Sequence, residues 1–91
     1  MARFTALVQI FVKTSGLDDV ERALSKLDNL EALYEVTGEF DIVALISARD
    51  SAEFREIIKE KVRTIEGVRA TAISVVLKDV RVPVKVPMIE A

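Results

Sequence analysis

The residues best suited to chemistry in this sequence surround one glycine in the stretch YEVTGEFDIV, residues 34–43. Gly38 allows a tight turn and a close approach of the backbone to a ligand. Glu39 and Asp41 follow it, and a carboxylate can hold the ammonium group of a small molecule through a charge-assisted hydrogen bond. The backbone of the turn, or a neighbouring Arg or Lys, is the alternative partner for Asp41. The stretch therefore predicts either a ligand-binding turn or a purely structural one.

The composition narrows the possible chemistry. The chain has 91 residues with no His and no Cys, so it lacks the usual ligands of zinc, iron and copper and the commonest acid–base group near neutral pH. Its 13 basic and 15 acidic residues give a net charge of −2, which does not favour nucleic acid or an anionic membrane as a partner. We therefore expect a non-enzymatic domain with no catalytic residues, cofactor or metal site.

The start of the chain, MARFTALVQIFV, is apolar but is broken by Gln9 and followed by Lys13. It is too short to span a membrane and has no small-residue cleavage signature. The sequence therefore predicts a cytoplasmic protein.

Apolar periodicity predicts strands and two helices along the chain. Ser15, with Asp18 three residues later, predicts the start of a helix over about 17–28. Asp50 and Glu53 predict a second helix over about 51–66, which Gly67 ends. Strand patterns cover residues 3–13, 30–37, 40–48 and 69–78, and a further alternating segment at 80–86 contains Pro83, which restricts it to a sheet edge.

This order of elements predicts an α+β fold of the ferredoxin-like βαββαβ type, with a four-stranded antiparallel sheet and both helices on one face. Residues 1–91 are expected to form a single domain. Each helix stands alone between strands, so the sequence predicts no helix-turn-helix motif for DNA.

A two-residue loop at Gly38 and Glu39 predicts a type II′ turn that pairs Thr37 with Phe40. Strand alternation then places Asp41 with Tyr34 and Val43 on one face of the sheet, and Phe40 with Ile42 on the other. Both faces are largely apolar, and two helices can cover only one of them. We therefore expect a homodimer or larger assembly in which sheets pack face to face.

Three segments resemble the effector (RAM) domain of the Lrp/AsnC family of feast/famine transcription regulators. They are VTGEFDIVALI at 36–46, the D-x-x-x-F pattern at 50–54 and IEGVRATAISVVL at 65–77. The resemblance implies a ferredoxin-like dimer, a dimeric α+β barrel that often assembles into an octamer and binds amino acids at interfaces between dimers. It implies that the effector pocket uses Thr37, Gly38, Glu39, Phe40, Asp41 and Thr71. Ile73 departs from the family, whose members commonly have a second Thr there.

The resemblance also implies a stand-alone effector domain, since family members usually carry an amino-terminal DNA-binding domain. We expect effector-dependent self-assembly, or co-assembly with full-length Lrp/AsnC regulators, without direct contact to nucleic acid. One alternative is an enzyme of the dimeric α+β-barrel type, although the chain has no His or Trp. A second is an RNA-binding sheet, although FDIVALIS at 40–47 lacks the repeated aromatic and basic residues on which bases stack.

Overall fold

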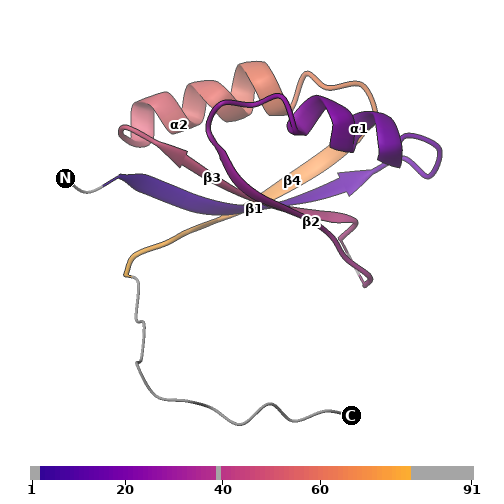
Figure 1. Cartoon of the computed structure of the whole chain (residues 1–91), viewed down its shortest axis with the longest axis horizontal. Coiled ribbons are helices and arrows are strands. Elements are labelled where there is room, and N and C mark those ends of the chain that lie inside the picture. Colours follow the sequence, from indigo (N-terminus) through magenta and orange to yellow (C-terminus); the bar gives the residue numbers. More distant parts are fainter. Residues whose placement is uncertain (1–2, 39, 79–91) are drawn as a thin grey trace, which may run out of the picture.

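The computed structural model of the chain describes residues 3–38 and 40–78. The elements are β1 (Phe4–Val12), α1 (Leu17–Leu24), β2 (Leu30–Glu35), β3 (Ile42–Ala48), α2 (Ser51–Ile57), the π-helical segment η1 (Ile58–Val62) and β4 (Val68–Val75). The four strands form one antiparallel sheet in the order β2-β3-β1-β4, with both helices on one face (Figure 1). The predicted ferredoxin-like fold is confirmed. Glu39 and the predicted edge strand at 80–86 lie outside the described residues.

The central strand β1 organises the hydrophobic core. It pairs with β3 on one side and with β4 on the other. Ala6, Val8 and Ile10 are fully buried beneath the helices, because a strand directs alternate side chains to the same face. The predicted strand over residues 3–13, with these side chains on one face, is confirmed.

The first helix is shorter than the sequence predicted. Gly16, not Ser15, occupies the N-cap position, and no side chain caps the helix. At its C-terminal end, two hydrogen bonds span three residues and not four. The Lys26 N–H donates to the Ala23 carbonyl at 3.2 Å, and the Leu27 N–H donates to the Leu24 carbonyl at 3.0 Å. These tighter turns end the helix, so the predicted extension to about residue 28 is wrong.

The second helix begins as predicted and then changes its form. The Asp50 side chain accepts a hydrogen bond from the Glu53 N–H at 2.8 Å. From Ile58 the backbone is π-helical, and the Arg63 N–H donates to the Ile58 carbonyl at 2.9 Å. The predicted helix over about 51–66 is therefore α-helical only to Ile57, and it ends at Val62 and not at 66. Gly67 has a φ of +105°, in agreement with the glycine expected after the helix.

The register of the β2–β3 hairpin is the predicted one near the turn. Tyr34 lies opposite Val43 and Glu35 opposite Ile42, as required if Thr37 faces Phe40. A register shift between Leu30 and Ala32 then pairs Leu30 with Ile46. Strict alternation from Tyr34 would place Leu30 on the opposite face, but the bulge reverses the alternation, and Leu30 packs against the core beneath the helices.

The face of the sheet away from the helices is largely apolar and is uncovered by the described residues. Alternation places on it Leu7, Phe11, Tyr34, Val43 and Leu45, together with the polar Thr5, Gln9 and Ser47. Four of the five apolar side chains are half-buried, and Tyr34 is 59% exposed. We call this surface the open face. No helix in the described part of the chain is long and apolar enough to cross a membrane.

Candidate functional site

The tip of the β2–β3 hairpin holds most of the predicted site residues and projects beyond the sheet (Figure 1). The Val36 N–H donates to the Asp41 carbonyl at 3.0 Å, which closes the base of the turn. Gly38 has a φ of +123°, and no heavy atom lies within 4 Å of the position that a Cβ would take. The backbone at Gly38 is therefore open to an approaching molecule, and Thr37 beside it is exposed.

Asp41 is tied to the central strand. Its Oδ2 accepts a hydrogen bond from the Val12 N–H at 2.8 Å, and its own N–H donates to the Ile10 carbonyl at 3.1 Å. The Lys13 N–H donates to the Gly67 carbonyl beside β4, so the N–H of the preceding Val12 points to the β3 side of β1. The β1–β3 ladder ends at the pair of Ile10 and Ile42, and the Asp41 carboxylate takes the place of a strand carbonyl as the acceptor for Val12. Within residues 3–38 and 40–78, the partner of the carboxylate is thus the backbone of a neighbouring strand, and not the turn itself or a basic side chain.

Phe40 lies against Phe11, with the ring centroids 4.6 Å apart and the planes at 51°. Phe11 belongs to the open face, so the placement of Phe40 with Ile42 on the opposite face is wrong. Regular pairing of β3 begins only at Ile42, and strand alternation does not govern the residue two positions earlier. Phe40 joins the edge of the open face instead.

Thr71 lies apart from the hairpin tip. It pairs with Ile10 in the β1–β4 ladder, and Ile10 is buried beneath the helices, so Thr71 points to the helix-covered side. Strand spacing puts Thr71 about 10 Å from Ile42, with β1 between them. Thr71 lines a hollow of 390 Å³ with Arg63, Val68, Arg69 and Ala70. Within the described residues, one chain does not bring Thr71 and the hairpin into the same cavity.

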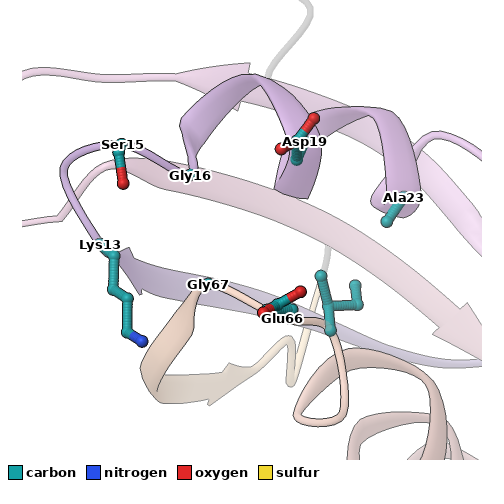
Figure 2. A pocket seen from close by; sticks show the side chains of 8 residues that line it. Lys13, Ser15, Gly16, Asp19, Ala23, Glu66 and Gly67 are labelled. Atoms are coloured by element: carbon teal, nitrogen blue, oxygen red, sulfur yellow. The ribbon is translucent and has the colours of Figure 1, made fainter.

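A hollow of 610 Å³ that the sequence did not predict lies between α1 and the turn before β4 (Figure 2). Lys13, Asp19 and Glu66 line it. Gly16 and Gly67 also line the hollow, and a Cβ at Gly16 would lie 3.5 Å from the Gly67 Cα, a close approach that the sequence does not signal. All three charged side chains are exposed, and Asp19 already pairs with Arg22 at 3.1 Å. We therefore assign no ligand to it.

Two carboxyl groups meet where α1 passes the end of β2. A side-chain hydrogen bond with Glu35 raises the pKa of Glu21 above its ordinary value, and partial burial and repulsion from Glu35 and Asp18 act in the same direction. Glu35 is the last residue of β2 before the hairpin tip. In residues 3–38 and 40–78, this region included, no three acidic side chains gather closely enough to hold a metal ion.

The comparison with known families is decisive for this chain. Residues 5–83 match the sequence profile of the Lrp/AsnC ligand binding domain. The chain belongs to the Lrp/AsnC ligand-binding domain family. The expected family is thus confirmed, and the hairpin tip and Thr71 are parts of a ligand-binding domain.

Relatives of this Lrp/AsnC domain occur in different protein contexts. Homocitrate synthase of Saccharolobus solfataricus is 41% identical over 59 residues, which are 65% of this chain but only 13% of that enzyme. The protein TTHA0845 from Thermus thermophilus has 26% identity and a TM-score of 0.81, with 86% of this chain and 98% of that chain covered. The transcriptional regulator NMB0573 from Neisseria meningitidis, solved in complex with L-Met, has 19% identity and a TM-score of 0.82, with coverage of 92% and 56%.

We predict that Asp41 stabilises the fold through its bond to Val12. Asp41→Ala leaves a partly buried N–H without an acceptor and lowers the free energy of unfolding by about 1–3 kcal/mol. Asp41→Asn keeps an acceptor oxygen and costs less than half as much. Urea denaturation at one fixed protein concentration measures both. Equal losses for the two variants would show that the hydrogen bond is not the cause.

The Glu21–Glu35 pair predicts a pH dependence of stability. The raised pKa of Glu21 in the folded state means that the folded chain binds this proton more tightly than the unfolded chain. The resulting stabilisation is complete below the ordinary glutamate pKa, and it is lost as the pH rises through the folded-state pKa of Glu21. Glu35→Gln reduces this loss. Melting curves across mildly acidic pH measure it, with Glu31→Gln on the same strand as control; an unchanged slope in Glu35→Gln contradicts the prediction.

Proposed function

We propose that the chain is a non-enzymatic module that binds a free amino acid and couples binding to self-assembly. The open face is the observation that carries this proposal. Complete burial of one large apolar side chain contributes about 1.5–3 kcal/mol, and four of the five are already half-buried in one chain. Covering the face therefore adds on the order of a few kcal/mol, which is a large part of the stability of a small domain. A second copy that presents the same face would bury them in a symmetric interface.

The hairpin tip provides the chemistry for the amino acid. The open backbone at Gly38 offers N–H groups to a carboxylate, and the exposed Thr37 adds a hydroxyl. Asp41 uses one carboxylate oxygen for Val12, and we propose that the other receives the ammonium group of the ligand. Glu39 and Phe40 complete the proposed loop. The complex of the regulator NMB0573 with L-Met supports an amino acid as the class of ligand.

Thr71 enters this proposal through assembly. Because it points to the helix-covered side, away from Asp41, we propose that its hydroxyl contacts an amino acid held by the hairpin of another copy. The pocket is then incomplete in one chain, and ligand binding favours the assembled state. Dimers of this kind, joined further into an octamer or a similar ring, would form such pockets, and full-length Lrp/AsnC regulators are candidate partners in mixed assemblies.

A second candidate function is the regulation of an enzyme. The 41% identity with a segment of homocitrate synthase favours it, because that segment is a small part of a much longer enzyme. In this alternative, the same hairpin would report amino-acid concentration to a biosynthetic enzyme and not to a transcription regulator. The ligand class and the assembly would be the same.

We predict that a charge on the open face dissociates the assembly. Val43→Asp places a carboxylate in the proposed apolar interface, where an unpaired charge is costly, so the variant is a monomer at micromolar concentration while the wild type is a dimer or larger. Light scattering measures the mass. Ala52→Asp, on the exposed start of α2, is the matched control and keeps the assembly. A wild type that is monomeric at this concentration contradicts the prediction.

We predict that one or more of the twenty amino acids raises the melting temperature. A ligand at about 100 times its dissociation constant adds about 2.7 kcal/mol to the stability. Gly38→Val abolishes this response, since a β-branched residue is strained at positive φ and blocks the approach. Asp41→Asn weakens it by removing the charge.

The screen uses thermal shift and calorimetry on the wild type, both variants and Glu31→Gln as a control away from the tip. Circular dichroism confirms that each variant is folded. If no amino acid binds the folded wild type, the hairpin is a structural turn and the ligand-binding part of the proposal fails.

A further inference from the structure

A second surface, on the helix-covered side of the sheet, is a groove between the helical segment α2–η1 and β4. It has a volume of 510 Å³. Five of its lining residues are apolar, and Ser51 and three basic residues complete it; the apolar ones are Phe4, Phe54, Ile58, Ile73 and Val75. The rings of Phe4 and Phe54 lie 5.1 Å apart and form its inner end.

The groove exists because the helical layer stops short of the edge strand. Ile73 pairs with Val8, and Val75 pairs with Ala6. Val8 and Ala6 are fully buried, whereas Ile73 and Val75 are 43% and 45% exposed. Paired residues on the same face of the sheet thus differ in exposure, because α2–η1 covers β1 and leaves β4 uncovered.

One wall of the groove is basic. Arg55, Lys59 and Arg63 follow one another at four-residue intervals along α2–η1 and all line the groove. Four residues make slightly more than one turn of an α-helix, which has 3.6 residues per turn. They make slightly less than one turn of a π-helix, whose turns contain more residues. The change from α to π at Ile58 therefore keeps the row on one side of the helix. Among the described residues, none of the three forms a salt bridge.

We propose that this groove binds an acidic amphipathic helix of another protein. Such a helix would lie beside α2–η1 as a third member of the helical layer, with its apolar stripe on Ile73, Val75 and Ile58. Acidic side chains four residues apart on its flank are about 6 Å apart along the axis, which matches the spacing of the basic row. The part of α2–η1 that lines the groove, from Ser51 to Arg63, extends about 18 Å, which accommodates three turns of a partner helix.

The basic charge of the groove favours an acidic partner over another segment of the same chain as its occupant. Segment 80–86 is apolar but carries Arg81 and Lys85, which would repel the basic wall, and Pro83 and Pro87 disfavour a helix there. The groove also lies on the side opposite the open face, so a dimer formed through that face leaves it accessible. Its Arg63 end adjoins the Thr71 hollow that the proposed function assigns to the hairpin of another copy, and the test therefore uses Arg55 and Lys59, farther along the row.

The test uses a synthetic labelled peptide of four helical turns, with Leu along one stripe and Glu at four-residue spacing on its flank. Fluorescence anisotropy measures its binding to the full chain. We expect micromolar binding that weakens with added salt. The double variant R55E/K59E lowers the affinity by about tenfold or more, equivalent to about 1.4 kcal/mol. The matched double reversal K26E/K61E, at exposed positions outside the groove, leaves it unchanged.

Two further measurements make the result specific. Ile73→Asn, a change at a half-exposed position, weakens binding while circular dichroism shows an intact fold. A peptide in which Lys replaces every Glu does not bind. The proposal is overturned if the acidic peptide does not bind at millimolar concentration, or if the Lys peptide binds equally well. It is also overturned if K26E/K61E loses as much affinity as R55E/K59E, or if anionic vesicles or single-stranded RNA bind the groove more tightly than the peptide.

Discussion

The whole structure depends on a sheet whose central strand carries large apolar side chains on both faces. Ala6, Val8 and Ile10 of β1 anchor the core beneath the helices, while Leu7 and Phe11 of the same strand contribute to the open face. The two helices among the described residues cover one of these surfaces. The other face is covered by none of the described residues, and the proposed self-assembly rests on this difference.

The arrangement of the elements could be predicted because local signals and long-range pairing agree. The Gly38 turn and the alternation of its flanking strands fixed the hairpin register, and the Asp50 cap fixed the start of α2. The shift between Leu30 and Ala32 could not be predicted, since no glycine or proline signals it in the sequence. The π-helical turn at Ile58 likewise arises among good helix-forming residues.

The candidate site was harder to predict than the fold because its geometry depends on distant parts of the chain. The sequence drew attention to Asp41 but could not supply its partner, because the Val12 N–H lacks a strand acceptor only where the β1–β3 ladder ends at Ile10 and Ile42. Thr71 was identified from the family pattern, yet the face on which it lies follows from its pairing with buried Ile10. The groove beside β4 depends on how far the helices extend over the sheet, which periodicity alone does not determine.

The Asp41 carboxylate that we propose as a ligand-binding group also accepts the hydrogen bond from the Val12 N–H. Any cation that draws the carboxylate towards itself competes with a hydrogen bond that holds the hairpin to the middle of the sheet. The loop therefore cannot respond to a ligand independently of β1, and any displacement of Asp41 alters the end of the strand that supports both faces. A substitution at this position changes ligand recognition and the rigidity of the hairpin together. A survey of the residues tolerated at position 41 would therefore report the sum of the two effects without separating them.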